Sequence, residues 1–144
     1  MTILSVRQPW AHALVAGWKP GDNRSWRTTY RGTLGIHAGR RRDDAAAVDF
    51  VTRLHPELAS VRLTYSGLIG TVTLVDVIST REAYEERRLR PWVKRDIEWF
   101  WLVGEPTMFS RAIPMSGQLR LFKASISLEA EMVSIASEGT GKIQ

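Results

Sequence analysis

Short segments in which apolar and polar residues alternate recur along the chain, and this period of two is typical of strands that are buried on one face. Residues 67–78 give the strongest signal, because aliphatic side chains crowd this segment. The predicted strands are 2–6, 33–38, 67–78, 98–103, 111–115 and 119–124, and residues 23–27 are predicted to be extended.

Apolar residues spaced three and four apart predict helices between these strands. Pro9 suits the first position of a helix in which Trp10, Ala13 and Leu14 share one face. Gly17 is suited to end this helix, because glycine readily adopts the left-handed conformation found there. A turn that contains a proline and a glycine follows it.

Two more helices are predicted in the middle of the chain. Asp43 or Asp44 can cap a helix over 45–54, and Thr80 can cap a short charged helix over 81–88. The apolar stripe of the helix over 45–54 consists of Ala47, Val48, Val51 and Leu54.

Five or six short strands with two or three inserted helices predict an α+β fold, in the form of a small mixed β-barrel. A sheet of βαβ units is not expected, because strands and long helices do not alternate. The chain of 144 residues has the length of one domain. We expect that domain to span 1–128, and we expect 129–144 to form a short helix or a disordered tail.

The charge balance of the sequence favours an anionic partner. The sequence has 20 Lys and Arg against 15 Asp and Glu, a net charge of +5 and a pI near 10.1. A basic domain favours RNA or DNA as partner, and six tryptophans add rings on which bases can stack. A surplus of solvated arginines explains the same charge equally well, and most tryptophans in proteins lie in cores.

The absence of cysteine excludes a disulfide scaffold, a Cys-ligated zinc site, an iron–sulfur cluster and a cysteine nucleophile. The longest apolar run, residues 99–103, is far too short to span a bilayer. Residues 1–7 lack the apolar segment of a secretion signal. We therefore expect a cytoplasmic protein without a membrane partner.

Several separated motifs, taken in order, resemble one family. These motifs are residues 4–11, 17–19, 22–26, 30–32, 66–72, 74–76, 100–102, 113–114, Gly117 and 121–123. Their order and spacing over residues 3–128 are similar to the ASCH domain (activating signal cointegrator homology). The resemblance implies a β-barrel of the PUA-like superfamily, whose members bind RNA or modified nucleosides or bases.

The same resemblance implies activities. Some ASCH proteins are reported as ribonucleases or as amidohydrolases that act on acylated cytidine, and others are regarded as nucleic-acid-binding modules. The amidohydrolase members place a threonine nucleophile three residues after a lysine that Lys19 matches, but here that position is Asp22. A carboxylate cannot act as a hydroxyl nucleophile, so deacylation is the weaker expectation. Most ASCH sequences carry glutamate where Asp22 stands, and its acidic character is thus kept.

The start of the first helix is a candidate ligand site. Gln8 and Trp10 lie at a strand-to-helix junction, where unpaired backbone amides attract a phosphate or a base carbonyl. Gln8 can both donate and accept, and Trp10 can offer a stacking face. The alternative is that Gln8 caps the helix and Trp10 belongs to the core.

The turn after this helix supplies charged residues. If residues 23–27 are extended, Arg24 and Trp26 share one face, and Lys19, Asp22 and Arg24 can converge at the mouth of a cleft. A desolvated lysine can act as a base, but Asp22 opposes this by favouring the charged form. Lys19 therefore suits a phosphate or base-edge ligand at least as well, and a surface salt bridge to Asp22 is the alternative.

His37 ends a predicted strand, and an imidazole can move protons near neutral pH. Lys19, Asp22 and His37 are accordingly the candidate catalytic residues, although a structural histidine bonded to the backbone explains His37 as well. The scattered histidines have no metal-binding spacing, so no cofactor is expected. A divalent ion held by Asp22 or Glu98 during RNA cleavage remains an alternative.

Basic residues outside this pocket can follow a nucleic-acid backbone. The candidates are Arg27, Arg31, Arg40, Arg41, Arg42, Arg88, Arg90 and Lys94. A solvated charged face is the simpler explanation for any single one of them.

The leading hypothesis is an RNA-binding protein with a basic cleft for a nucleotide or modified nucleoside. Single-stranded RNA is the favoured partner and DNA an alternative, and the oligomeric state is left open. The predicted ligand-binding residues are Gln8, Trp10, Lys19, Asp22, Arg24 and Trp26.

Two other functions compete with this hypothesis. The first is a hydrolase, chiefly a ribonuclease in which the RNA 2′-hydroxyl is the nucleophile and Lys19 or His37 moves protons. The second is a protein–protein module of a transcription or translation complex. An exposed apolar patch formed by Trp92, Trp99 or Phe109 would favour this module.

Overall fold

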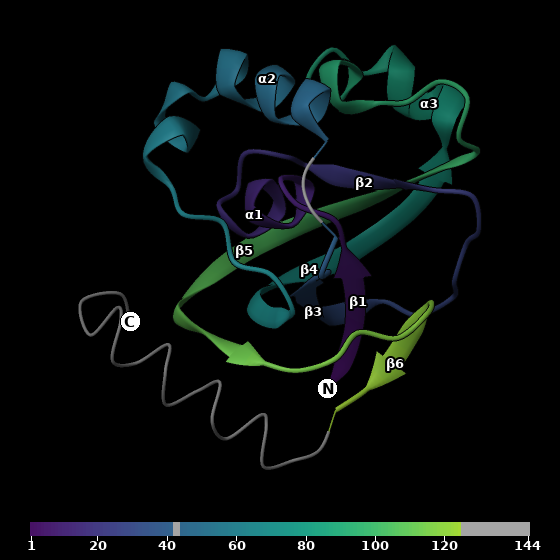
Figure 1. Ribbon diagram of the computed structural model, residues 1–144. Coiled ribbons are helices and arrows are strands. Elements are labelled where there is room, and N and C mark those ends of the chain that lie inside the picture. The colour runs from purple at the N-terminus through teal and green to yellow at the C-terminus, as the bar shows by residue number, and fades with distance from the viewer. Residues whose placement is uncertain (42–43, 125–144) are drawn as a thin grey trace.

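The computed structural model describes residues 1–41 and 44–124. Its strands form a six-stranded sheet in the order β2-β5-β4-β3-β1-β6, which curls into a half-barrel (Figure 1). Strands β1 and β3 pair in parallel and the other neighbours are antiparallel. The strands are β1 (Thr2–Val6), β2 (Gly21–Arg24), β3 (Gly32–Ala38), β4 (Gly67–Ser79), β5 (Trp99–Pro114) and β6 (Leu121–Lys123). The predicted α+β fold with a small mixed barrel is confirmed.

Helix α1 (Trp10–Val15) lies inside the curl of the sheet and packs against β3, β4 and β5. Its Leu14 joins Leu4 and Trp101 in the main core, where each is at most 2% exposed. A Cβ atom at Gly70 of β4 would overlap the Thr107 carbonyl oxygen and lie 2.9 Å from Val15 Cγ1. A glycine at this position therefore allows the helix and the sheet to approach closely.

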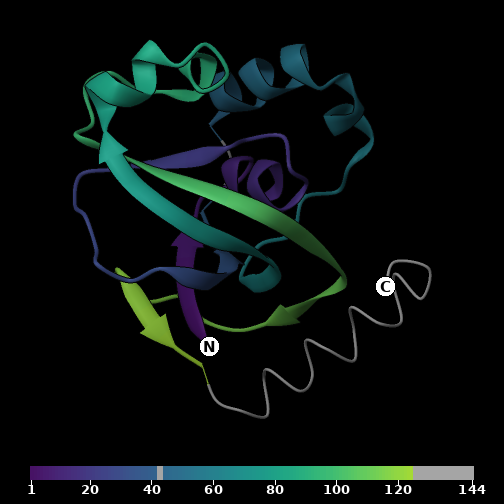
Figure 2. The ribbon, with the colours of Figure 1, turned by 180° about the vertical axis from the view of Figure 1, so that it is seen from behind.

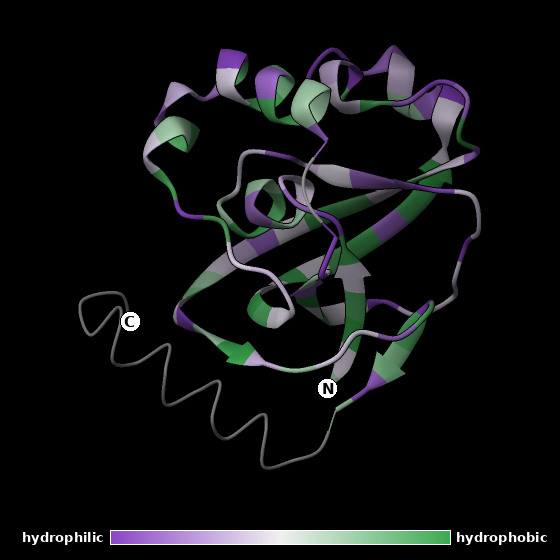
Figure 3. Cartoon of the chain, in the orientation of Figure 1, coloured by the Kyte–Doolittle hydropathy of each residue, from purple (hydrophilic) through white to green (hydrophobic). Residues whose placement is uncertain are grey.

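The remaining helices cover one end of the half-barrel, beyond β2 (Figures 1 and 2). They are α2 (Ala45–Leu54), α3 (Thr80–Glu85) and the 3-10 helices η1 (Pro56–Ser60) and η2 (Arg90–Trp92). A second core joins them to the sheet through Val51, Leu89 and Phe100. Their ribbons carry both hydrophilic and hydrophobic residues (Figure 3).

The structure joins two predicted strands, 98–103 and 111–115, into the single strand β5. The register between β4 and β5 shifts where Thr73 pairs with Gly104 and Thr71 pairs with Thr107. This shift leaves an extra residue on β5, a β-bulge of the kind that tolerates a proline, here Pro106. The proline therefore interrupts the pairing without ending the strand.

Four smaller expectations are also corrected. The extended segment 23–27 ends at Arg24, and the helix over 81–88 ends at Glu85. Its cap is Ser79 rather than Thr80, because the Ser79 hydroxyl accepts from the Glu82 amide at 3.1 Å. Leu54 is 45% exposed and does not belong to the buried stripe of α2. The predicted tail, 129–144, lies outside the described residues.

Candidate ligand-binding site

The backbone after α1 directs Lys19 into the protein. Gly17 adopts a positive φ of 82° and ends the helix as predicted. The amides of Trp18 and Lys19 both donate to the Ala13 carbonyl at 2.9 Å, so the chain turns back beneath the helix. The Lys19 residue is only 4% exposed as a result.

Two cations meet the carboxylate of Asp22 in β2. Lys19 Nζ donates to Asp22 Oδ1 at 2.9 Å, and Arg24 Nε donates to Asp22 Oδ2 at 2.9 Å. Arg24 Nη2 also donates to the Ser5 carbonyl at 2.9 Å, and Lys19 Nζ lies 4.9 Å from the centre of the Trp10 ring. The three ionic side chains together carry one surplus positive charge.

Opposing effects act on the pKa of Asp22. Burial raises this pKa, but attraction to Lys19 and Arg24 and hydrogen bonds from both outweigh burial, so the pKa lies below its ordinary value. Asp22 is therefore an ionised acceptor at neutral pH.

These side chains line a cavity of about 650 Å³, which we call the Lys19 cavity. One wall is formed by Lys19, Asp22 and Arg24, and three aromatic residues also line the cavity. They are Trp10, Phe50 and Trp92, with the Phe50 ring tilted against Trp10 at 6.2 Å and edge-on to Trp92 at 5.6 Å. Arg7 and Lys94 also line the cavity, and both are exposed.

The side chain of Asn23 holds part of this cavity in place. Its Nδ2 donates to the Trp92 carbonyl, and its Oδ1 accepts from the Lys94 amide, both at 2.9 Å. The segment that follows η2 is thereby fixed to the edge strand β2.

Gln8 does not line the Lys19 cavity, so the structure does not bring it together with the other predicted ligand residues. Gln8 Nε2 donates to the Thr64 carbonyl at 2.9 Å, and Gln8 Oε1 accepts from the His12 amide at 2.9 Å. Further amides of the first turn, those of Ala11 and Ala13, donate to backbone carbonyls. Gln8 thus caps the helix, and the predicted anion site at its start is not formed by these amides.

His37 is also absent from the Lys19 cavity, which separates it from the other two candidate catalytic residues. It lines a different cavity of about 840 Å³, which we call the His37 cavity. His37 Nδ1 lies 2.9 Å from Ser5 Oγ, and Nε2 lies 2.8 Å from the Met115 carbonyl oxygen. Both ring nitrogens are therefore engaged within the protein.

Trp26 lies outside the cavity because β2 ends at Arg24, so the alternation that would align these two residues stops. The Trp26 ring packs edge-on against Trp101 at 4.7 Å, and Trp101 Nε1 donates to the Trp26 carbonyl at 3.0 Å. The structure thus places Trp26 in packing contacts apart from the other predicted ligand residues.

Of the predicted backbone-binding residues that the structure describes, only Lys94 lines the Lys19 cavity. Arg27 lies over the Trp99 ring, and Arg31 pairs with Asp76 at 3.3 Å. Arg42 lies outside the described residues. Arg40 lines the His37 cavity, and Arg41 and Arg88 are exposed.

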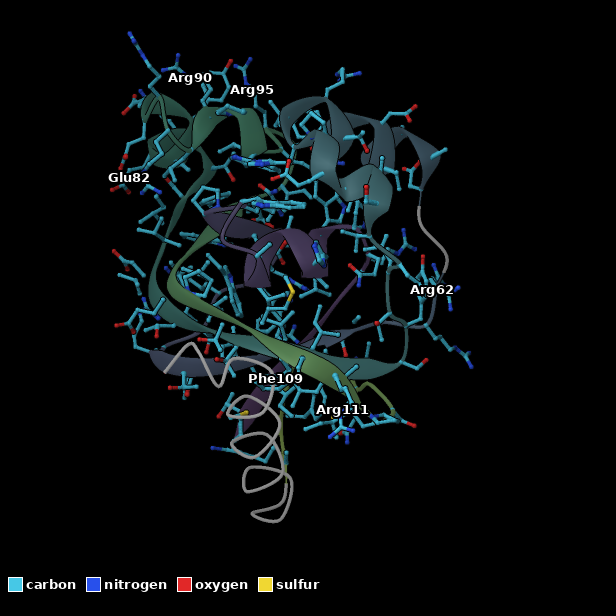
Figure 4. All side chains as sticks on the ribbon, turned by 90° about the vertical axis from the view of Figure 1, so that its left-hand side faces the viewer. Arg62, Glu82, Arg90, Arg95, Phe109 and Arg111 are labelled. Carbon is cyan, nitrogen blue, oxygen red and sulfur yellow. The ribbon has the colours of Figure 1, made fainter. Side chains whose placement is uncertain are left out.

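Arg90 lies at the end of the molecule that carries α3, near Arg95 (Figure 4). Its Nε donates to the Tyr84 carbonyl at 2.7 Å. The guanidinium groups of Arg90 and Arg95 lie 5.2 and 4.5 Å from the centre of the Tyr84 ring.

Sequence reasoning missed Arg7, Asn23, Phe50 and Trp92 as cavity residues. A signal existed for Phe50, because it stands three positions after Ala47 and thus on the same helical face. Asn23 and Trp92 gave no such signal, since their pairing joins positions 69 residues apart.

Two alternatives from the sequence, a bound divalent ion and an apolar protein-binding patch, were compared with the described residues. They contain no group of three or more His, Asp or Glu side chains placed to hold a metal ion, and Glu98 is not among the residues lining the Lys19 cavity. Of the three residues suggested for an apolar patch, Trp92 and Phe109 are each only 8% exposed, and Trp99 is half-buried. In the part of the chain that the structure describes, no helix has the length and apolar character needed to cross a membrane.

Comparisons with known proteins agree with the fold. Activating signal cointegrator 1 from Mus musculus and from Homo sapiens is in each case 29% identical over 126 residues, which cover 83% of this chain and 22% of the relative. The chain thus spans about a fifth of the length of these relatives.

Among solved structures, ASCH from Zymomonas mobilis superimposes with a TM-score of 0.63 at 13% identity, over 93% of this chain and 94% of that one. A point mutant of the same protein gives 0.62 at 14% identity, over 93% and 96%. The family model described as ASCH domain matches residues 4–106, and this chain therefore belongs to the ASCH domain family.

Proposed function

We propose that this chain binds RNA, preferably single-stranded, and takes one base or nucleoside into the Lys19 cavity. The observation that carries the proposal is that ionic side chains and aromatic rings line one cavity together. Its volume of about 650 Å³ lies within the range of ligand pockets, roughly 300–1,000 Å³.

The residues that line the cavity match different parts of a nucleotide. The rings of Trp10, Phe50 and Trp92 offer surfaces against which a base can pack. The exposed cations Arg7 and Lys94 can meet the adjoining phosphates. The net charge of +5 supports the same partner, as does the RNA binding that the family resemblance implies.

The proposal is binding without turnover. The Lys19 ammonium donates to Asp22, and the ring nitrogens of His37 are engaged beside another cavity. Among the described residues, the candidate proton carriers Lys19 and His37 thus lie at two different cavities. Intact RNA after incubation is expected, and cleavage that persists in Lys19→Ala protein would point to a contaminant or to another site.

Binding is tested by fluorescence anisotropy with a labelled single-stranded RNA at about 50 and 200 mM salt. Affinity should fall as salt rises, and Lys94→Gln and Phe50→Leu should each weaken binding several-fold. Arg81→Gln is the matched control, because Arg81 is exposed and does not line the Lys19 cavity. Absent or salt-independent binding would overturn the proposal, and the same DNA sequence reports the preference for RNA.

A further inference from the structure

The ionic side chains of the Lys19 cavity stand in a fixed order. Lys19 Nζ bonds to one oxygen of Asp22, and Arg24 Nε bonds to the other. The carboxylate thus lies between an ammonium and a guanidinium, and the wall has a donor, an acceptor and a donor in sequence.

Part of the hydrogen-bonding capacity of this wall is left over. An ammonium has three N–H donors and a guanidinium has five. Lys19 uses one of them on Asp22, and Arg24 uses one on Asp22 and one on the Ser5 carbonyl. Each carboxylate oxygen has a second lone pair. Lys19 Nζ also lies 4.9 Å from the centre of the Trp10 ring, and all three side chains line the cavity.

The order of donors and acceptors selects among the four RNA bases. The Watson–Crick edge of uracil presents O2, N3–H and O4, which are an acceptor, a donor and an acceptor. Cytosine presents a donor and two acceptors, guanine an acceptor and two donors, and adenine a donor and one acceptor. Only the imide edge of uracil complements all three groups of the wall.

We propose that Lys19, Asp22 and Arg24 recognise the imide of a uracil base, with Asp22 accepting from N3–H and the two cations donating to O2 and O4. This inference rests on the proposed function, because it assumes that an RNA base enters the Lys19 cavity. Lys19 and Asp22 are 4% and 7% exposed, so a base with the wrong edge leaves buried polar groups unpaired. A preference of about tenfold or more, equivalent to about 1.4 kcal/mol, is expected.

The test uses single-stranded oligo-adenosine with one central nucleotide varied among uridine, N3-methyluridine, cytidine and adenosine. The uridine RNA should bind about tenfold tighter than the other three. N3-methyluridine keeps both carbonyls and loses only the imide proton, whereas cytidine alters the edge without adding bulk. Equal affinity for uridine and cytidine would overturn the inference and leave RNA binding intact. Failure of every RNA, including one of mixed sequence, would overturn the proposed function.

A pair of substitutions assigns the preference to this wall. Asp22→Asn replaces an acceptor by an amide that can donate to N3 of cytosine. The affinity for uridine RNA should therefore fall, and the preference for uridine over cytidine RNA should shrink or reverse. Lys94→Gln, which lies outside this wall, should weaken the binding of every RNA and retain the order of preference. Thermal melting verifies that both variants are folded. An unchanged uridine preference in folded Asp22→Asn would show that this wall does not read the imide.

Discussion

The Lys19 cavity and the His37 cavity share the residue Ser5, yet their buried polar groups are used in opposite ways. The Ser5 carbonyl accepts from Arg24 in one cavity, and the Ser5 hydroxyl bonds to His37 Nδ1 at the other. Because the Met115 carbonyl can only accept, His37 Nε2 donates to it, and Nδ1 bonds to the Ser5 hydroxyl. The imidazole has no capacity left, whereas Lys19, Asp22 and Arg24 do. A buried titratable side chain beside a cavity is thus a ligand candidate only where its bonding capacity is not already used.

The largest expected effect comes from breaking the ion pairs of the Lys19 cavity. Lys19→Met leaves the buried Asp22 carboxylate with Arg24 alone, so the free energy of unfolding should fall by about 3 kcal/mol. Urea denaturation measures this change. Lys94→Met, on the same cavity but exposed, should change stability by less than about 0.5 kcal/mol. Equal losses of unfolding free energy in the two variants would show that the buried Asp22 carboxylate does not need the Lys19 cation.

This contrast explains which site residues could be predicted from the sequence. Lys19, Asp22 and Arg24 are predictable because a glycine-ended helix, a turn and a short strand bring near neighbours together. Gln8 and His37 look equally suited to a ligand in the sequence. What disqualifies them is a set of partners such as Thr64 and Met115, which lie 56 and 78 residues away and leave no local pattern.

The elements of the fold also divide into those that a local sequence pattern predicts and those that depend on pairing with distant residues. The segments that became β1, β3 and β4 are visible in the period-two pattern, and Asp44 caps α2 as one of two predicted candidates, accepting from the Ala46 amide at 3.0 Å. The continuity of β5 is not visible, because a proline within a strand is tolerated only when the partner strand allows a bulge. That information resides in the pairing with β4.

Acid should weaken the Lys19 cavity without any substitution. The pKa of the Asp22 carboxyl lies below its ordinary value of 3.8, since Lys19 and Arg24 together outweigh the effect of burial. The folded state therefore binds fewer protons than the unfolded state, and this stabilisation is complete above the ordinary pKa and lost as pH falls through the lower, folded-state pKa. The loss should be smaller than in Lys19→Met, because a protonated Asp22 carboxyl can still accept hydrogen bonds from Lys19 and Arg24.

The check on this acid dependence is the free energy of unfolding measured from neutral pH down to about pH 2. Asp22→Asn cannot titrate at this position, so its curve should fall less steeply below pH 4 than that of the wild-type protein. If the two curves of unfolding free energy against pH run parallel, other carboxyl groups cause the loss of stability in acid.

The smallest expected effect disturbs the His37 cavity and leaves the Lys19 cavity intact. A Cβ at Gly117 would overlap Ser5 Oγ and lie 2.8 Å from His37 Cε1, so Gly117→Ala forces its segment to shift and should reduce the free energy of unfolding by about 1 kcal/mol. Gly104→Ala is the control, because its nearest neighbour, Val75 Cγ2, would be 3.7 Å away. RNA affinity should be unchanged in both variants, since neither glycine lines the Lys19 cavity. A loss of RNA affinity in Gly117→Ala would mean that Ser5 couples the two cavities. The conclusion that the two cavities use their polar groups independently would then be wrong.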